Sequence, residues 1–469
     1  MIPAEARNWL PPGFEPALSA RWFVPDGHTL KGYLRDGGYT GLQNVLKMQP
    51  DEVIDQVKKS SLRGRGGAGF PTGMKWSFVP KESPKPKYMV VNGDESEPGT
   101  FKDRYTLARD PHRLLEGAAI GAYAVGAHQI YIYVRGEFGL SHHRLFEAVK
   151  EAYAHGVFGS SCLGSGYALE CHVHRGAGAY ICGEETALLE GLEGKVGRPR
   201  LKPPFPAVVG AFGGPTVVNN VETLSCVPLI FERGLEWFLA QGSDKNGGPK
   251  LVCVSGHVER PGVYEVPNGY PLDRFLELAG GVWKGRALKA VIPGGSSSPV
   301  LVPKPSKALA AADAPESDWP LETQVPLDFD NIRKAGSMFG SAGMIVLDET
   351  TCMVRSLANL ARFYAHESCG QCTPCREGTG WTSKMLWRLE RGESRPDDLQ
   401  IMKSTADALD AGLTICVLAQ ALSMPVLSYW GKFRPEFEAH VEREGCWFER
   451  EPVAPGGAAA YEDGRQWKA

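Results

Sequence analysis

Four cysteines in the C-terminal third of the chain have the spacing of metal ligands. Cys369, Cys372 and Cys375 form a C-x₂-C-x₂-C run, and Cys416 follows at the expected start of a later helix. Three thiolates on one short loop can each bind an iron of a cubane, so the fourth ligand must come from elsewhere. Structural zinc sites more often take their cysteines in two pairs. The spacing favours a [4Fe–4S] cluster, with zinc or no metal as alternatives; His366 is better explained as a neighbouring histidine than as a ligand.

The other seven cysteines stand alone in apolar or mixed sequence, where free cysteine usually behaves as a small buried hydrophobe. The total of 11 is odd and the chain is large, at 469 residues, which argues against a disulfide framework. We expect reduced thiols and assign no role to Cys162, Cys171, Cys182, Cys226, Cys253, Cys352 and Cys446.

A glycine-rich segment, Gly64–Gly69, contains the pattern G-x-G-x-x-G. It follows a helical, lysine-bearing stretch instead of a buried strand, so it is not a standard dinucleotide fingerprint. A flexible loop is the alternative. Phosphate binding is favoured by the cations around it, and ring binding by the aromatic residues that follow it. The cations are Arg63, Arg65 and Lys75, and the aromatic residues are Phe70, Trp76 and Phe78.

Two further loops follow predicted strands and carry carboxylates. Residues 92–99 contain three acidic side chains in four positions, and residues 176–186 combine glycines with Tyr180, Glu184 and Glu185. An acidic turn is usually solvated surface, but the carboxylates of residues 92–99 follow a buried strand, where they suit ribose or ribityl hydroxyls and would repel a 2′-phosphate, which favours NAD over NADP. Acidic residues in a helix's first turn also complement its dipole, so Glu184 and Glu185 have a purely structural explanation as well.

Alternating strands and helices must position these loops. Strands are expected at 87–91, 129–134, 169–174 and 216–218, and helices at 112–126, 143–155, 184–192 and 221–241. This alternation predicts an α/β fold with a mostly parallel sheet, whose ligands bind beyond the carboxyl ends of its strands. Residues 251–301 predict a compact ubiquitin-like α+β unit. Beyond Gly340 the helical period predicts a small bundle.

Composition excludes several classes of protein. Hydrophobic residues make up 43% and charged residues 22%, as in an ordinary globular protein, and the formal net charge of −3 does not indicate a basic nucleic-acid binder. No stretch approaches eighteen consecutive apolar residues, so no transmembrane helix is expected. The first residues lack the pattern of a secretory signal. We expect a cytoplasmic protein, which leaves docking onto a membrane-bound assembly open.

Taken together, the motifs resemble the NADH-binding flavoprotein subunit of respiratory complex I. The matching stretches occur in the same order along the chain and several are long. They are 62–73, 92–104, 178–187, 201–206, 219–223 and 367–378. After Cys416 the sequence departs from the versions of the family that have a Gly-Asp pair and a Trp-Pro, which leaves the surroundings of a cluster undefined.

The resemblance implies a Rossmann-like FMN and NADH domain with its N-terminal lead-in at 1–245, a β-grasp domain at 246–335, an iron–sulfur bundle at 336–445 and a flexible tail at 446–469. It implies that FMN contacts Gly64, Gly66, Gly67, Lys75, Asn92, Asp94, Ser96, Gly183, Asn219, Asn220 and Thr223. NADH would meet Phe70, Phe78, Glu184, Glu185, Lys202 and Phe205, with Glu97 and Tyr180 near the nicotinamide as the catalytic residues. The cluster ligands would be Cys369, Cys372, Cys375 and Cys416.

The implied chemistry is hydride transfer from NADH to the flavin, followed by single-electron transfer to the cluster. The implied partners are a small thioredoxin-like [2Fe–2S] subunit and the large iron–sulfur subunit of the peripheral arm, without nucleic acid and without membrane insertion. Alternatives are the diaphorase subunit of a soluble NAD-linked hydrogenase or formate dehydrogenase, a scaffold without redox activity, and a zinc-stabilised binding module.

Overall fold

The computed structural model describes residues 10–312 and 314–448, which form two compact units. The first unit contains its described residues up to Ser96, then Phe101–Val252 and Tyr264–Gly269. The second contains Glu97–Thr100, Cys253–Val263 and the described residues from Tyr270 onward. The domain boundaries given above stay predictions, and residues 449–469 of the predicted tail lie outside the described residues. Within the described ranges, no helix has both the length and the apolar character needed to cross a bilayer.

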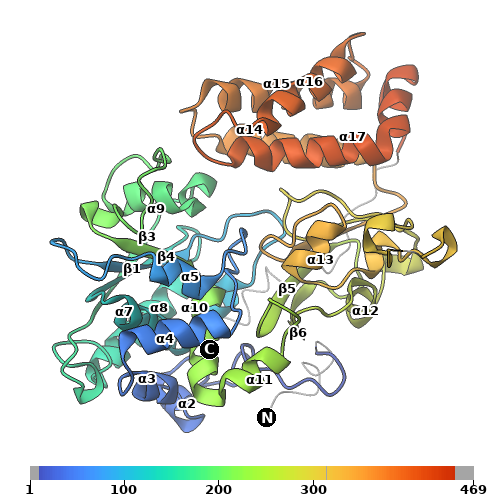
Figure 1. The fold of residues 1–469 in the computed structure, drawn as a ribbon. Coiled ribbons are helices and arrows are strands. Elements are labelled where there is room, and N and C mark those ends of the chain that lie inside the picture. The colour runs from blue at the N-terminus through green and yellow to red at the C-terminus, as the bar shows by residue number, and fades with distance from the viewer. Residues whose placement is uncertain (1–9, 313, 449–469) are drawn as a thin grey trace. The chain divides into compact units, whose positions relative to one another are not determined.

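A four-stranded parallel sheet organises the first unit (Figure 1). Its strand order is β3-β2-β1-β4, and each neighbouring pair runs parallel. The inner strand β1 is buried along most of its length, whereas the edge strand β3 has only Cys171 buried. This sheet confirms the predicted α/β organisation. The strands are β1 (Tyr88–Gly93), β2 (Gln129–Val134), β3 (Glu170–Arg175) and β4 (Thr216–Asn220).

Helices α7 (Pro111–Val125), α8 (Gly139–Ala154) and α10 (Val221–Arg233) lie on one side of this sheet (Figure 1). Small residues allow close packing, because a Cβ on Gly117 would come 1.9 Å from the Leu224 carbonyl oxygen of α10. The predicted single helix 221–241 is wrong at Gly234. Its φ of 89° and ψ of 159° suit glycine and break the segment into α10 and α11 (Leu235–Ala240).

The remaining helices of the first unit are short, apart from α4, which is the helical, lysine-bearing stretch expected before the glycine-rich segment. They are α2 (Leu30–Arg35), α3 (Thr40–Val45), α4 (Pro50–Lys59), α5 (Thr72–Ser77), α6 (Asp103–Arg109) and α9 (Glu185–Leu192).

The N-terminal segment is fixed by a carboxylate that lies far away in the sequence. Glu265 accepts hydrogen bonds from the backbone N–H groups of Ala17, Leu18 and Ser19, each at 2.8 Å, and from the Ser19 hydroxyl at 2.7 Å. All four residues are buried. The first unit therefore includes residues 264–269, which are synthesised after most of that unit.

A second sheet has the strand order β6-β5-β8-β7. Its strands are β5 (Pro249–Gly256), β6 (Gly262–Pro267), β7 (Leu288–Ile292) and β8 (Gly343–Asp348), and the helices α12 (Leu272–Leu278) and α13 (Phe329–Lys334) accompany them. β5 and β8 pair in parallel, and β7 and β8 pair antiparallel. No strand was expected at β8, because its six residues lie directly before a long helical pattern.

Four helices form the predicted bundle of the second unit (Figure 1). They are α14 (Met353–Glu367), α15 (Thr373–Arg391), α16 (Asp398–Asp410) and α17 (Leu418–Glu442). Met353, Leu357 and Tyr364, which recur at helical spacing, are buried, whereas Trp381 is 54% exposed. Pro425 and Pro435 both lie inside α17, whose backbone is non-helical at Phe433.

Candidate functional site

Amide side chains gather at the carboxyl edge of the parallel sheet. The register pairs Asn92 of β1 with Asn220 of β4, and Val91 with Asn219, so the two strands end side by side. The Asn219 side chain accepts a hydrogen bond from the Trp76 indole N–H at 2.8 Å. Parallel sheets of this kind bind ligands beyond these strand ends. The edge therefore presents fixed amide groups where a ligand is expected.

The loop after β1 packs against the loop that precedes α9. Asn92 Nδ2 donates to the Gly183 carbonyl at 2.8 Å, and the Asn92 side-chain oxygen accepts from the Asp94 N–H at 3.0 Å. The Ser96 hydroxyl donates to the Asp94 carboxylate. A Cβ on Gly183 would lie 3.3 Å from the Asp94 carbonyl oxygen, so this glycine permits the close approach. Two loops predicted to belong to one site thus meet.

The glycine-rich loop reaches the same edge through its backbone. The Arg65 N–H donates to the Thr223 hydroxyl at 2.7 Å, and a Cβ on Gly66 would lie 3.0 Å from the Asn220 Cβ. Gly67 has a φ of 145° and open space where a Cβ would be. Because these glycines have no side chain, a bound group can approach the backbone closely. The predicted loop is therefore shaped as a cradle.

One predicted cation of this loop points elsewhere. The Arg65 side chain is fully buried and donates to the Gly247 carbonyl oxygen at 2.7 Å, while Arg63 donates to the Gly69 carbonyl oxygen at 2.6 Å. The expectation that Arg65 lines a phosphate site is wrong, because its guanidinium is used inside the unit. Lys75 remains a candidate: its ammonium lies 2.9 Å from the Glu185 carboxylate and both groups are part-exposed.

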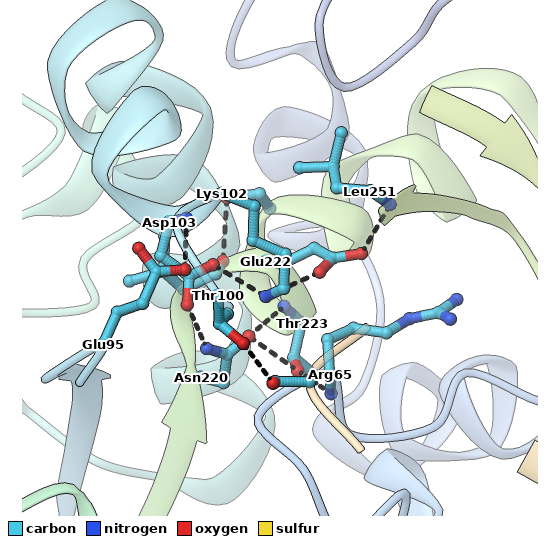
Figure 2. Close-up of polar contacts among 12 residues, drawn as sticks. Arg65, Glu95, Thr100, Lys102, Asp103, Asn220, Glu222, Thr223 and Leu251 are labelled. Carbon is cyan, nitrogen blue, oxygen red and sulfur yellow. Dashed lines mark hydrogen bonds and ion pairs between the residues drawn. The ribbon is translucent and has the colours of Figure 1, made fainter. Parts of the chain in front are cut away.

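A buried cluster of charges supports this edge (Figure 2). The Glu222 carboxylate lies 2.8 Å from both the Lys102 and the Lys250 ammonium groups. Asp103 accepts from Asn220 Nδ2 at 2.6 Å, and the Asp103 N–H donates to Glu95 at 2.9 Å. The Asp103 carboxylate thus fixes the orientation of an amide predicted to contact the ligand.

Burial and neighbouring charges set the protonation of this cluster. Burial opposes ionisation of Glu222, but the ammonium groups of Lys102 and Lys250 outweigh it and lower the pKa to about 2. Burial lowers the pKa of Lys250 to about 8. Burial, together with the Asp103 charge, raises the pKa of Glu95 to about 7. This cluster was not predicted from the sequence, where its only signal is that charged residues stand inside otherwise apolar stretches.

The two acidic residues before and within α9 have different surroundings. Glu184 caps the helix, because its carboxylate accepts from the Thr186 N–H at 2.8 Å and the Ala187 N–H at 3.0 Å. Glu185 instead pairs with Lys75 at 2.9 Å and Lys202 at 3.0 Å. Burial opposes its ionisation, yet these lysines lower the pKa of Glu185. Its charge is thus held in place between two cations.

Three phenylalanines predicted to stack on a ring are exposed on the first unit. Their exposed fractions are 45% for Phe70, 54% for Phe78 and 58% for Phe205. The Phe70 and Phe78 ring centroids lie 6.0 Å apart. Large aromatic residues exposed in this way are typical of a surface that covers an apolar ligand face.

The two predicted catalytic residues lie in different units. The Glu97 carboxylate, in the second unit, accepts from the Ser297 N–H at 2.8 Å and the Ser296 hydroxyl at 3.1 Å. It also accepts from the Tyr364 hydroxyl at 3.3 Å. Tyr180, in the first unit, begins the short helix η2 (Tyr180–Gly183). Their catalytic roles stay predictions.

The predicted cluster cysteines gather at one end of the bundle. Cys369 lies in the loop between α14 and α15, Cys372 directly precedes α15 and Cys375 lies in its first turn. Cys416 shortly precedes α17, and the neighbouring Ile415 N–H donates to Cys372 Sγ at 3.4 Å. The segment that carries Cys416 therefore lies against the three-cysteine loop, and a set of four thiolates suits an iron–sulfur cluster.

Comparisons with known proteins match all of these regions. Residues 57–229 match the family described as the Nuo51 FMN-binding domain, residues 251–300 an SLBB domain, and residues 355–440 the NADH-ubiquinone oxidoreductase-F iron-sulfur binding region. The second NADH-quinone oxidoreductase F subunit of Rhizobium meliloti is 52% identical over 437 residues, covering 93% of this chain and 100% of that protein. The NADH-quinone oxidoreductase F subunit of Streptomyces coelicolor is 47% identical over 454 residues, covering 97% and 96%.

The chain belongs to the family of NADH-quinone oxidoreductase F subunits.

This membership confirms the predicted function. The chain oxidises NADH and is an electron-input subunit, with FMN and a [4Fe–4S] cluster as cofactors. The residues present fit both groups: a cradle of small residues and amides at the sheet edge fits FMN, and four thiolates from two adjoining segments fit the cluster. The three-plus-one cysteine spacing favoured the cluster over zinc, and the glycine-rich loop pointed to FMN only together with the other motifs of the family resemblance.

A solved structure gives a more distant match. The NAD⁺-reducing [NiFe]-hydrogenase in the H2-reduced state superposes with a TM-score of 0.75 at 34% identity, covering 91% of this chain and 67% of that chain. The oxidoreductase relatives are closer in sequence, at 47–52% identity. The expectation of a complex I subunit is thereby favoured over a hydrogenase diaphorase.

Proposed function

We propose that FMN binds at the carboxyl edge of the parallel sheet in the first unit. The pairing of Asn92 with Asn220, beside a glycine loop that is open at Gly67, carries this proposal. When bound, FMN accepts a hydride from NADH and releases electrons singly. The chain's own residues orient it: Asn92, Asn220 and Thr223 as fixed polar groups, with Gly64, Gly66, Lys75, Asp94, Ser96, Gly183 and Asn219 completing the site.

NADH is assigned to the exposed rings of Phe70, Phe78 and Phe205, which would stack on adenine. Glu185 accepts hydrogen bonds from the adenosine ribose hydroxyls, and its carboxylate is oriented by ion pairs with Lys75 and Lys202. Glu184 acts indirectly, since its other carboxylate oxygen lies 2.8 Å from Lys202 and so helps to position that lysine.

Near the nicotinamide we place Glu97 and Tyr180. The three donors on Glu97 hold its carboxylate in one orientation, which suits a group that positions a substrate amide. Neither side chain needs to act as a nucleophile, because bound FMN would supply the redox chemistry. Orientation and exclusion of water are the contributions expected of these residues.

The [4Fe–4S] cluster is assigned to Cys369, Cys372, Cys375 and Cys416. We further propose that the first unit has a Rossmann-like fold and that the domain containing β5 to β8 has a β-grasp fold. The partners are a small thioredoxin-like [2Fe–2S] subunit and the large iron–sulfur subunit of a peripheral arm, at the cytoplasmic face of the membrane.

The flavin assignment is tested by anaerobic purification with absorbance and EPR spectra before and after NADH. Gly66→Val should lower the FMN content several-fold, because its side chain meets Asn220. Gly139→Ala is the matched control, since nothing lies within 4 Å of a Cβ there. Full FMN content in Gly66→Val would reject the cradle, and an NADH-treated protein that keeps oxidised flavin would reject the function.

The partner assignment has a separate test. A tagged full-length chain, purified under native conditions from its own cells, should carry [2Fe–2S] and large iron–sulfur subunits of a quinone oxidoreductase, identified by mass spectrometry. Recovery of hydrogenase or formate dehydrogenase subunits in their place would assign the chain to a soluble diaphorase.

A further inference from the structure

A second group of metal-ligating side chains lies within the helical bundle. Cys352, Glu390, His440 and Cys446 each offer one ligand atom, and these four atoms all lie within 4.8 Å of one another. The first three residues are buried and Cys446 is partly exposed. The expectation that Cys352 and Cys446 stand alone is therefore wrong, because the fold brings together segments 94 positions apart in the sequence.

These residues lie at the end of α14 away from the predicted iron–sulfur loop. Cys352 directly precedes α14, Glu390 lies in the last turn of α15, His440 lies in the last turn of α17, and Cys446 follows that helix. The iron–sulfur loop follows the opposite end of α14. A helix of 15 residues is about 22 Å long. The two groups of cysteines thus cannot share one metal centre.

The spacing of the ligand atoms suits a tetrahedral zinc ion. Cys352 Sγ lies 3.3 Å from His440 Nε2 and 3.7 Å from a Glu390 carboxylate oxygen, and these last two atoms are 3.9 Å apart. Zinc bonds of about 2.3 Å to sulfur and about 2.0–2.1 Å to nitrogen or oxygen, at tetrahedral angles, separate the ligand atoms by about 3.3–3.8 Å. Small side-chain shifts would complete the site.

The outer contacts orient these atoms inward. His440 Nδ1 lies 2.7 Å from the Glu436 carbonyl oxygen, so Nδ1 carries the proton and the lone pair of Nε2 faces the cluster. The Arg355 N–H donates to Cys352 Sγ at 3.3 Å, and the Arg355 guanidinium donates to Cys446 Sγ at 3.0 Å. Metal-bound histidines and thiolates commonly have such partners.

The charges also balance. A divalent cation with two thiolates and one carboxylate has a net charge of −1. The guanidinium of Arg355, which pairs with Glu390 as well as Cys446, supplies the compensating positive charge. A buried group of this composition is therefore neutral with its arginine, which removes the main cost of burying charge.

We propose that Cys352, His440, Cys446 and Glu390 bind one zinc ion that fastens the end of α17 and the segment beyond it to α14 and α15. Two thiolates with an imidazole favour zinc over harder divalent cations. Binding releases the two thiol protons to solvent and transfers no electrons. The ion is structural, since all four positions are filled by protein.

Zinc K-edge X-ray absorption on the full-length protein, with zinc and iron measured by mass spectrometry, tests the proposal without any substitution. We expect about one zinc per chain, with two sulfur ligands at about 2.3 Å and nitrogen or oxygen ligands at about 2.0 Å. A four-sulfur spectrum would overturn it, because the zinc would then occupy the iron–sulfur cysteines. Absence of zinc after growth with added zinc would also overturn it.

Substitutions locate the ion. Cys446→Ser and His440→Asn should each lower the zinc content at least fivefold while iron and FMN stay at the unmodified level. Cys162→Ser, another buried cysteine outside the cluster, is the matched control and should retain zinc. Unchanged zinc in Cys446→Ser, or a Cys352–Cys446 disulfide in a non-reducing peptide map of the native protein, would refute the site. If a variant does not fold, the absorption spectrum of the unmodified protein still decides.

Discussion

Replacing Glu222 with glutamine tests whether the buried charge cluster stabilises the flavin edge of the sheet. The carboxylate accepts from the Lys250 ammonium at 2.8 Å and from the Leu251 N–H at 3.0 Å, and it lies 2.8 Å from the Lys102 ammonium. Glutamine keeps the shape of the side chain and removes its charge. Two buried ammonium groups are then left with one anion fewer, in a place that water does not reach.

The lowered pKa of Glu222 gives the size of the effect. A shift from 4.5 to about 2 corresponds to about 3 kcal/mol, at about 1.4 kcal/mol per unit. Because the pKa is depressed in the folded state, this stabilisation is present above pH 4.5 and is lost as the pH falls through about 2. The difference in unfolding free energy between Glu222→Gln and the unmodified protein should be complete at pH 7 and shrink in acid.

Thermal unfolding, followed by circular dichroism and by the fluorescence of released flavin, measures the change. For a unit of this size, about 3 kcal/mol corresponds to a fall in Tm of about 6–12 °C. Glu236→Gln is the control, since Glu236 lies exposed in the first turn of α11. Adding Lys250→Met removes the excess charge and should recover part of the loss. A Tm within about 2 °C of the unmodified protein at pH 7, or strictly additive losses in the double variant, would refute the reasoning.

Three further substitutions address the proposed binding residues. Glu185→Ala should lower the ratio of kcat/KM for NADH to that for NADPH about tenfold, because Lys75 and Lys202 lose their carboxylate partner and can pair with a 2′-phosphate. An unchanged ratio would show that Glu185 does not discriminate against NADPH. Phe205→Ala should raise the KM for NADH about tenfold at constant kcat, because stacking stabilises the ground state and the transition state equally. Steady-state kinetics with an unchanged KM would contradict stacking on Phe205. Cys416→Ser should lower iron per chain while flavin content and NADH bleaching persist; iron at the unmodified level would remove Cys416 from the ligand set.

Local sequence patterns predicted the parts of the fold that depend on neighbouring residues. The strand at 129–134 was predicted residue for residue, because its apolar alternation is bounded by clear turn signals. The helix around Pro111–Val125 was predicted to within one residue at each end, since its glycine and alanine spacing matches the helical period. The glycine loop and the cysteine run are also local, which explains why the candidate cofactor sites were found.

Long-range pairings were beyond the reach of these patterns. Lys102, directly before α6, and Lys250 of β5 meet at Glu222 of α10 only in the folded unit, and no spacing along the chain signals it. Cys352 and His440 likewise lie 88 positions apart. The strand β8 pairs with β5 across about 90 residues, so its register depends on a partner that local periodicity does not show.

The contact between Glu265 and residues 17–19 bears on the order in which the protein is made. These backbone groups leave the ribosome early, yet the carboxylate they bind is translated 246–248 residues later. At about 5–20 residues per second, this interval lasts about 12–50 s. Until then the backbone N–H groups of residues 17–19 lack this carboxylate partner. Nascent chains stalled before residue 265 should therefore expose the N-terminal segment to proteases and chaperones, whereas chains stalled well beyond that point should protect it.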